Sequence, residues 1–268
     1  MTVRIGLVAG AGELPVAFAR NAKARGDTVV VLALKGVTSE ELSKYAEKVH
    51  WFEWGDLKKA MLLAVTERLR KIALLGKIKK EILFKDSDKL DEESKDIVRK
   101  AGGKKDYAIL KGIANLVKTI GIEIIDPTPY LEELIPVKGV LTKRAPTKAE
   151  KEDIEYGRQV ASDLAKFDIG QTVVIKDRTV IALEAAEGTD ETVVRAGKLA
   201  GGGFTVVKMA RPDQDARFDI PLVGPDTIKG IIASHGAVLA LQEKKTFLMN
   251  RDEVIALANS SNISIVVV

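Results

Sequence analysis

The fold is decided by residues 3–34, which read VRIGLVAGAGELPVAFARNAKARGDTVVVLAL. The apolar runs at the two ends of this stretch have the length and composition of buried strands. Between them, Leu14, Phe18 and Ala22 recur at helical spacing, and Gly26 supplies a C-terminal stop. A strand, a helix and a strand in this order predict a parallel pair joined by a right-handed crossover.

The same alternation continues outward through the first half of the chain. Further strands are predicted at 49–54, 72–76 and 121–126, with the amphipathic segment DLKKAMLLAVTERLRK between the first two. Asp126-Pro127-Thr128-Pro129 then interrupts the pattern and is the best candidate for a linker. We therefore predict a Rossmann-like domain with a parallel sheet over residues 1–128.

The second half, residues 129–268, has a different organisation. A long helix is predicted over RAPTKAEKEDIEYGRQVASDLAKF, where Thr147 and Glu150 have the spacing of a capping box. TVVIKD and TVIALEA follow as a hairpin, and further strands alternate with helices up to the C-terminal ISIVVV. The prediction for the whole chain is α/β: a Rossmann-like parallel-sheet N-terminal domain and a distinct mixed α/β C-terminal domain.

Composition limits the chemistry. The chain has 268 residues, 46% of them hydrophobic, enough for two ordinary cores. No apolar run approaches the ~18 residues that cross a bilayer, and no charged leader with a cleavage site opens the sequence, so we expect a cytoplasmic protein. With no cysteine and two histidines, a metal would be held by oxygen ligands, which favours Mg²⁺.

Charge is shared unevenly between the halves. Residues 1–128 carry the positive excess, so this half should attract anions. Most of the excess lies in KIKKEILFKDSDKLDEESKDIVRKAGGKK, where acids alternate with bases, as on a solvated helical face. No aromatic residues interleave with it in the way that nucleic-acid binding uses, so nucleic acid is not an expected partner.

A glycine-rich turn, Gly10-Ala11-Gly12, lies between the first strand and its helix. Glycines there let a ligand phosphate approach the backbone and the helix N-terminus. A purely structural turn is the alternative. A nicotinamide site fits poorly, because Pro15 stands where the third glycine belongs and the second strand ends in Leu34-Lys35 without an acid for a ribose.

A first group of acids lies in LEAAEGTD: Glu184, Glu187 and Asp190. These acids occupy a strand end and the turn that opens the next helix. Thr189 or Asp190 could cap that helix, with the acids favoured by its dipole. Two carboxylates at one strand end could equally hold a divalent cation.

A second group lies in RPDQDARFDIPLVGPDT, residues 211–227, and consists of Asp213, Asp215, Asp219 and Asp226. Asp226 follows Pro225 where a helix starts, a position that suits a carboxylate. Asp219 has no such structural explanation. Its neighbours are Phe218 and Ile220-Pro221, and burying a carboxylate without a partner costs free energy. Rigid neighbours hold a group in place, as a metal ligand or general base requires.

Two remaining motifs are interpreted as structural. His235, before Gly236, fits a helix end better than a catalytic role. Gly201-Gly202-Gly203 precedes a strand instead of a helix, so it lacks the geometry of a phosphate loop and only turns the chain.

Taken together, five segments resemble one family. In order they are IGLVAGAGELP, GVLTKRAPTKAEKEDIEYG, DIGQTVVI, ALEAAEGTDETVVRAG and VVKMARPDQDARFDIPLVGPDT. They resemble the UDP-2,3-diacylglucosamine pyrophosphatase of lipid A biosynthesis, in the form unrelated to calcineurin-like phosphoesterases. The resemblance implies Mg²⁺-dependent hydrolysis to UMP and 2,3-diacylglucosamine 1-phosphate at the cytoplasmic face of the inner membrane. It also implies an essential aspartate in the motif Asp219-Ile220-Pro221.

The candidate site follows from the residues and the resemblance together. The catalytic candidate is Asp219; the substrate-binding candidates are Gly10, Gly12, Thr189 and Arg217; the metal candidates are Asp219, Glu187, Asp190 and Asp215. The expected partners are Mg²⁺, a lipid-linked UDP-sugar and, in transient contact, a membrane surface, and a homo-oligomer is compatible with the sequence. The rival functions are a noncatalytic nucleotide-sugar sensor and a nicotinamide-dependent oxidoreductase.

Overall fold

A computed structural model describes residues 2–77, 90–100, 106–165, 167, 169–211 and 214–268. The chain forms two compact units. The first comprises Met1–Glu132 together with Asp215–Asp219, and the second comprises Glu133–Gln214 and Ile220–Val268. Each unit has its own sheet and its own buried apolar clusters. The predicted boundary after residue 128 stays a prediction.

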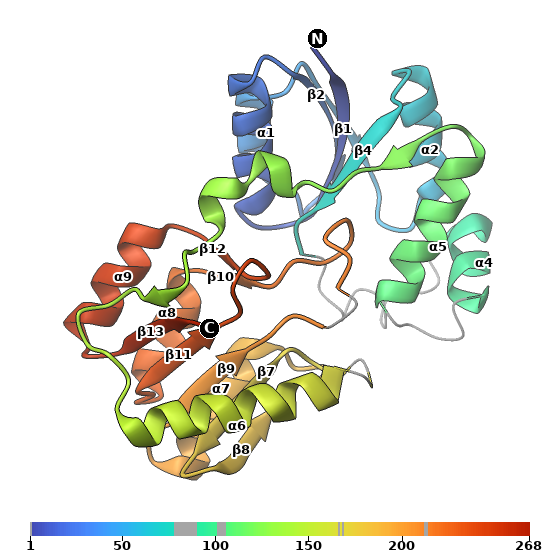
Figure 1. Ribbon diagram of the computed structural model, residues 1–268. Coiled ribbons are helices and arrows are strands. Elements are labelled where there is room, and N and C mark those ends of the chain that lie inside the picture. The colour runs from blue at the N-terminus through green and yellow to red at the C-terminus, as the bar shows by residue number, and fades with distance from the viewer. Residues whose placement is uncertain (1, 78–89, 101–105, 166, 168, 212–213) are drawn as a thin grey trace. The chain divides into compact units, whose positions relative to one another are not determined.

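The first unit is built on a five-stranded parallel sheet (Figure 1). Its strands are β1 Arg4–Ala9, β2 Thr28–Leu34, β3 Lys48–Phe52, β4 Lys71–Leu75 and β5 Glu123–Ile124. Their order, β3-β2-β1-β4-β5, confirms the predicted parallel sheet with crossovers. The direction of winding reverses between β1 and β4, and ligands of open α/β sheets bind outside the carboxyl ends of the strands at such a point.

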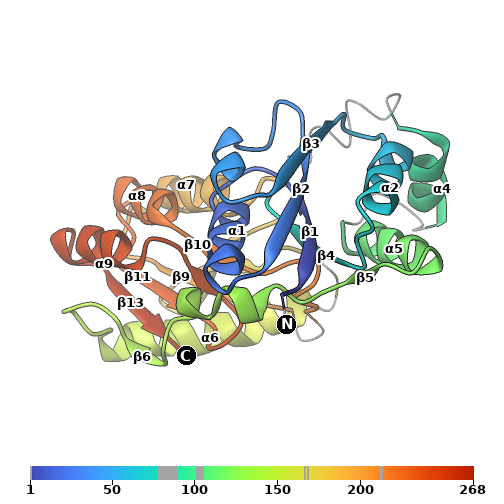
Figure 2. The same ribbon diagram turned by 90° about the horizontal axis from the view of Figure 1, so that it is seen from above.

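Helices cover both faces of this sheet. The helices described in this unit are α1 Leu14–Ala24, α2 Leu57–Thr66, α4 Glu92–Lys100, which packs on α5 and α2, and α5 Asp106–Thr119, with short 3-10 turns η1 Glu40–Lys44 and η3 Thr128–Tyr130. Helix α1 lies on one face, and α2 and α5 lie on the other (Figure 2). Helix α4 confirms part of the predicted solvated face, since Asp96 pairs with Arg99 and with Lys100. The rest of that basic stretch lies outside the described residues.

The turn after β5 is fixed to the first unit by Tyr130. Its ring packs against Phe18 with 4.9 Å between ring centroids. Its hydroxyl donates to Asp27 Oδ2 at 2.8 Å, and Asp27 Oδ1 accepts from the Val3 amide at 2.8 Å. Burial, with help from the Asp27 carboxylate, raises the pKa of Tyr130 to about 12. The chain therefore stays attached to the first unit beyond the predicted linker.

The second unit contains a mixed six-stranded sheet in the order β6-β13-β11-β9-β7-β8. The strands are β6 Gly139–Val140, β7 Thr172–Lys176, β8 Thr179–Leu183, β9 Thr205–Lys208, β11 Val238–Leu241 and β13 Ser264–Val267. Strands β9, β11 and β13 are parallel, whereas β6, β7 and β8 pair antiparallel. The β7–β8 hairpin confirms the prediction for that turn. A small parallel pair, β10 Leu222–Val223 and β12 Phe247–Leu248, accompanies the sheet.

The described residues of the second unit also form the helices α6 Lys148–Ala165, α7 Thr189–Ala200, α8 Pro225–Ala233 and α9 Arg251–Ser260. The capping box that begins α6 is confirmed. The Thr147 amide donates to Glu150 Oε2 at 2.7 Å, and the Glu150 amide donates to Thr147 Oγ1 at 3.3 Å. Within the described parts of the chain, no helix is both long and apolar enough to span a membrane.

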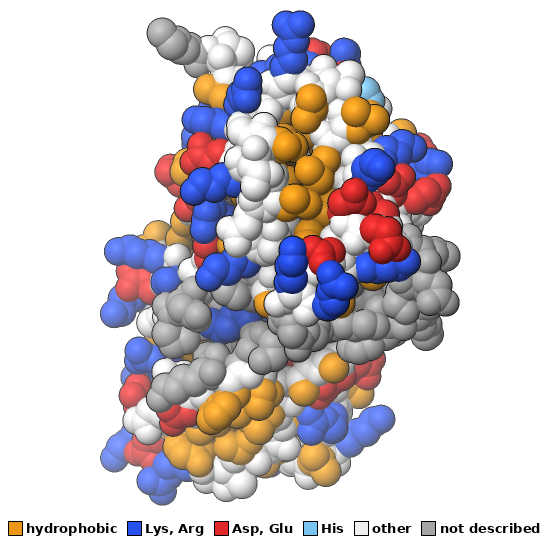
Figure 3. Space-filling view, turned by 90° about the vertical axis from the view of Figure 1, so that its right-hand side faces the viewer, with side chains coloured by type: hydrophobic (Ala, Val, Ile, Leu, Met, Phe, Trp, Pro, Cys, Tyr) orange, Lys and Arg blue, Asp and Glu red, His pale blue; other side chains and the backbone are white. Residues whose placement is uncertain are grey.

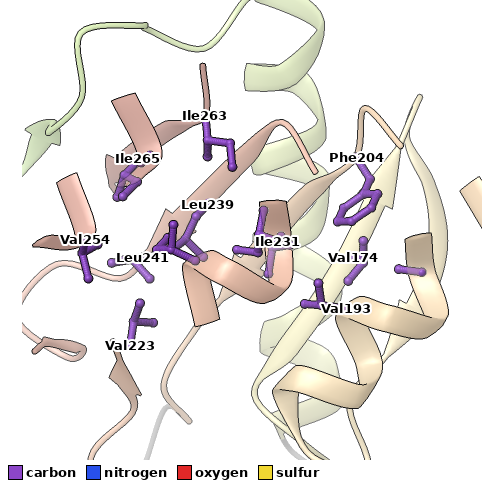
Figure 4. Close-up of a cluster of buried hydrophobic side chains, with 14 of the residues drawn as sticks. Val174, Val193, Phe204, Val223, Ile231, Leu239, Leu241, Val254, Ile263 and Ile265 are labelled. Atoms are coloured by element: carbon purple, nitrogen blue, oxygen red, sulfur yellow. The ribbon is translucent and has the colours of Figure 1, made fainter. Parts of the chain in front are cut away.

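Period-two alternation along the second sheet divides its core into two layers. Val174 of β7 belongs to one buried cluster with Val193 of α7, Ile231 of α8 and Val254 of α9 (Figure 4). Its neighbours in β7, Val173 and Ile175, belong to the other cluster, with residues of α6. The helices therefore sandwich this sheet as well.

Candidate functional site

The glycine turn at the end of β1 is held by backbone contacts with the end of β4. The Gly10 amide donates to Leu75 O at 2.8 Å, and Ala11 and Lys77 exchange two hydrogen bonds of 2.9 Å each. A Cβ on Gly10 would lie 2.8 Å from Lys77 O and 2.9 Å from the carbonyl carbon of Gly76. Gly10 is therefore needed for packing, and its amide already has a partner within the protein.

Gly12 has a different reason to be glycine. Its φ is +101°, a region that favours glycine, while the space around its Cα is open. It precedes α1 at the switch point of the sheet, where a ligand would approach the helix N-terminus. Substrate binding at Gly10 and Gly12 stays a prediction, and the geometry assigns close packing to Gly10.

The segment Asp215–Asp219 forms one compact turn. The amides of Phe218 and Asp219 both donate to Asp215 O, at 3.0 and 3.3 Å. The Arg217 guanidinium grips the Asp215 carboxylate, with Nε 2.9 Å from Oδ1 and Nη2 2.6 Å from Oδ2. This hydrogen-bonded pair, with Lys111 as a weaker contributor, lowers the pKa of Asp215. The carboxylate of Asp215 therefore forms a hydrogen-bonded ion pair with Arg217.

This turn belongs to the first unit, although both flanking segments belong to the second. Phe218 packs against the apolar cluster formed by the sheet, α2 and α5, and the Arg217 guanidinium lies 5.0 Å from the centre of the Phe218 ring. Asp219 is half-buried. The packing of Phe218 therefore accounts for the apolar residue on the N-terminal side of Asp219. Nothing in the sequence indicated that the turn would join the other unit.

A second polar cluster, in the second unit, is centred on Thr189. Its hydroxyl donates to Glu184 Oε1 at 3.1 Å and accepts from Lys208 Nζ at 3.1 Å. Lys208, at the carboxyl end of β9, is only 8% exposed and also donates to Leu222 O at 3.1 Å. The sequence interpretation missed Lys208, although a lysine inside the apolar run FTVVKM was a usable signal, because lysine is rarely buried.

Glu187 is held by a different set of donors. Its carboxylate accepts from the Ala185 amide at 3.1 Å, from the Thr192 hydroxyl at 3.3 Å and from Arg195 Nη2 at 2.7 Å. A hydrogen bond from its own amide is the largest influence that lowers the pKa of Glu187, and Arg195 adds to it. The carboxylate is therefore part of the turn before α7.

The predicted cap of α7 is wrong. The N-cap residue is Gly188, and no side chain makes a capping hydrogen bond there. Thr189 is instead occupied with Glu184 and Lys208, while Asp190 is exposed in the first turn of the helix. Asp190 therefore contributes only its charge at the positive end of the helix dipole.

The metal candidates fall into two pairs. Glu187 and Asp190 lie in the second unit, whereas Asp215 and Asp219 lie in the first. Oxygen donors suit Mg²⁺, but Glu187 and Asp215 each hold an arginine and do not fit a metal shell as they are arranged. Across the described ranges, no three Asp, Glu, His or Cys side chains gather as a metal-binding group. Asp213, a further acid of this stretch, lies outside the described residues.

Three other residues have structural positions. Asp226, in the first turn of α8, makes no capping hydrogen bond, and its side chain is 94% exposed beside Lys229. His235 follows α8 with φ +58°, which confirms a helix-end position. Gly201 ends α7 in the left-handed conformation, so the glycine run turns the chain as predicted.

Comparison with solved structures gives only distant likenesses. The biotin carboxylase domain of Hydrogenobacter thermophilus 2-oxoglutarate carboxylase is 13% identical at a TM-score of 0.31, with 75% of this chain and 42% of that chain covered. Biotin carboxylase of Campylobacter jejuni is 11% identical at a TM-score of 0.25, with 73% and 42% covered. This chain spans less than half of either structure, and at these TM-scores neither likeness bears on fold or function.

Sequence comparison gives a clear relationship. A protein of Caulobacter vibrioides named UDP-2,3-diacylglucosamine pyrophosphatase LpxI is 28% identical, with 96% of this chain and 94% of that protein covered. The model of the LpxI N-terminal domain matches residues 4–134, and that of the LpxI C-terminal domain matches residues 137–266. Because both domains match in order over nearly its whole length, the chain belongs to the LpxI family.

Proposed function

We propose that this protein hydrolyses the pyrophosphate bond of UDP-2,3-diacylglucosamine, giving UMP and 2,3-diacylglucosamine 1-phosphate for lipid A biosynthesis. One observation carries the proposal: the match to both LpxI domain models, residues 4–134 and 137–266, alongside a full-length relative with this activity in its name. The five ordered sequence motifs support the same substrate.

Asp219 is the proposed catalytic residue. In the reaction, a water oxygen forms a bond to one phosphorus of the diphosphate and the bridging P–O bond breaks. Asp219 is proposed to accept the proton that the water loses. The sequence contains no cysteine that could act as a nucleophile, and Asp215 and Glu187 are each hydrogen-bonded to an arginine. The half-buried position of Asp219 in a hydrogen-bonded turn suits a group that must be held in place.

The residues proposed to contact the diphosphate differ in whether their donor groups already have a partner within the protein. Gly12 offers an open backbone turn at the N-terminus of α1, where anions are favoured. Thr189 lies beside the buried ammonium of Lys208, 3.1 Å away. Arg217 would have to bind the diphosphate and the Asp215 carboxylate at the same time, since its guanidinium already donates two hydrogen bonds to Asp215.

Mg²⁺ remains a proposed requirement. When bound to a diphosphate, the ion would neutralise charge on the phosphate oxygens. Asp219 and Asp190 are the proposed ligands, because the carboxylates of Glu187 and Asp215 are each hydrogen-bonded to an arginine. Glu187 and Asp215 are better explained as structural carboxylates.

The proposed setting is the cytoplasmic face of the inner membrane, reached by transient contact. A lipid-linked substrate requires such contact, and the positive balance of the first half favours an anionic surface. Figure 3 shows exposed hydrophobic side chains gathered on the face it draws, with basic and acidic side chains around them, and the hydrophobic ones favour such contact.

The test is release of UMP from UDP-2,3-diacylglucosamine by the full-length protein, measured by mass spectrometry. We expect UMP and 2,3-diacylglucosamine 1-phosphate in equal amounts, loss of turnover in EDTA and recovery with Mg²⁺. Turnover at the same rate in EDTA would remove the metal requirement alone. Tight binding of the substrate without products would instead identify a sensor, and binding of NAD or NADP would favour an oxidoreductase.

A further inference from the structure

We propose that Phe218 is a positioning residue that fixes the Asp219 carboxylate on the first unit. The inference rests on the proposed function, since it concerns the residue that carries out the proposed proton transfer. Phe218 directly precedes Asp219, and its ring packs against the apolar cluster of the first unit. That cluster contains Leu34 and Phe52, the last residues of β2 and β3.

The chain around Asp219 provides no regular element to hold it. Among the described residues between β9 and β10 there is no helix or strand. Gln214 and Ile220, on either side of the segment, belong to the second unit. The five residues from Asp215 to Asp219 therefore keep their place in the first unit through side-chain contacts.

Internal hydrogen bonds shape the turn. The bonds from the amides of Phe218 and Asp219 to Asp215 O fix the two residues relative to Asp215. The Arg217–Asp215 pair closes the same turn on its outer side, where the Arg217 side chain is 45% exposed. A pair exposed to this degree contributes little to stability. The packing of Phe218 buries apolar surface in the first unit.

Contacts of Arg217 and Asp215 link Phe218 and Asp219 within one turn. Arg217 stacks 5.0 Å from the ring centre of Phe218 while it holds Asp215. The positive charge of Lys111, on α5, attracts the Asp215 carboxylate and contributes to lowering its pKa. The turn is thus closed by its own hydrogen bonds and packs against the first unit through the Phe218 ring. Removing the ring takes away this packing, so we expect the turn that carries the Asp219 carboxylate to become less fixed.

A general base that loses its alignment lowers turnover more than it lowers substrate affinity. For Phe218→Ala we expect kcat to fall about 100-fold, the scale of a displacement of about 1 Å, with KM changed by less than about threefold. Phe218→Leu keeps most of the apolar volume, so it should retain kcat within about fivefold of the parent.

The matched control is Met61→Ala. Met61, on α2, is also partly buried and packs against the same cluster, but it is remote in sequence from Asp219. It should lower the melting temperature about as much as Phe218→Ala while leaving kcat near the parent value. An equal loss of kcat in the two variants, or no loss in Phe218→Ala, would overturn the positioning role.

A second measurement does not depend on turnover. Hydrogen exchange of the peptide that contains the Phe218 and Asp219 amides, followed by mass spectrometry, should be faster in Phe218→Ala than in the parent and in Met61→Ala. If the parent hydrolyses no substrate, the proposed function fails, whereas faster exchange would still support anchoring by Phe218. Unchanged exchange in Phe218→Ala would overturn the anchoring even in an active enzyme.

Discussion

Asp219 and Asp226 lie seven positions apart in one acidic stretch, yet they have opposite structural settings. Asp219 is half-buried in the turn that Phe218 attaches to the first unit. Asp226 is 94% exposed and pairs only loosely with Lys229, at 3.6 Å. An exposed acid in a first helical turn favours the dipole by a few tenths of a kcal/mol up to about 1 kcal/mol. Asp226 therefore serves as the control for Asp219.

We expect Asp219→Asn to abolish UMP release, because an amide does not accept the proton from the attacking water. The melting temperature should change little, since the two side chains have the same shape. Asp226→Asn should retain parental turnover and lose less than about 1 kcal/mol of unfolding free energy. Initial rates and thermal melts of both variants check this prediction. Near-parental activity of Asp219→Asn would remove Asp219 from the catalytic role.

How far the sequence predicts the site differs from residue to residue. The unusual apolar surroundings of Asp219 were visible in the sequence, because only local neighbours were involved. The packing role of Gly10 was not, because it depends on Gly76, which approaches from the end of β4. The arginine partners of Glu187 and Asp215 were equally hidden, since side-chain pairing depends on how the turns close.

Three elements of the first unit meet at Glu67, just after α2. The Glu67 carboxylate accepts from Lys48 at 3.1 Å and His50 at 2.9 Å, both on β3, and from Arg4 of β1 at 2.7 Å. The hydrogen bond from Lys48, followed by those from His50 and Arg4, lowers the pKa of Glu67 to about 2. The Glu67 side chain is only 8% exposed. Its buried carboxylate therefore links β1, β3 and the end of α2.

A pKa lowered by folding stabilises the protein above the unfolded value, here 4.5, and the effect disappears as the pH falls toward 2. We expect Glu67→Gln to melt below the parent at pH 7, with the difference shrinking between pH 4.5 and 2. Glu53→Gln is the control, since Glu53 is 64% exposed in its pair with Lys35 and should change little at any pH. A difference between Glu67→Gln and parent that stays constant down to pH 2 would contradict the ionic origin.

Whole elements were more predictable than their pairings. Apolar periodicity located the long helices and the central strands, and the capping box located the start of α6. Of the two-residue strands, β5 lies within the apolar run predicted at 121–126, whereas β6, β10 and β12 lie in shorter runs without a periodic pattern and were missed. Their backbone pairing depends on chain segments that are distant in sequence, as when β6 joins β13.

At the scale of the whole molecule, the chain order and the compact units do not coincide. Each unit has its own sheet and apolar clusters, which is the usual condition for independent folding. Five residues encoded within the second unit, Asp215–Asp219, nevertheless belong to the first. A fragment of residues 133–268 therefore keeps its own core but lacks the cluster against which Phe218 packs.

We expect this fragment to melt cooperatively and to release no UMP, because the cluster against which Phe218 packs is absent from it.

A sharper measurement compares the loss of unfolding free energy caused by Phe218→Ser in the full chain and in the fragment. In the full chain the substitution should cost about 1–3 kcal/mol of unfolding free energy, as for a buried aromatic ring exchanged for a polar side chain. In the fragment it should cost almost nothing, since the ring is already exposed there. Met61 is absent from the fragment, so Val193→Ala, in the core of the second unit, serves as the control that must destabilise both proteins. An equal cost of Phe218→Ser in both contexts would show that the ring packs within residues 133–268, and the assignment of the Asp219 turn to the first unit would then fail.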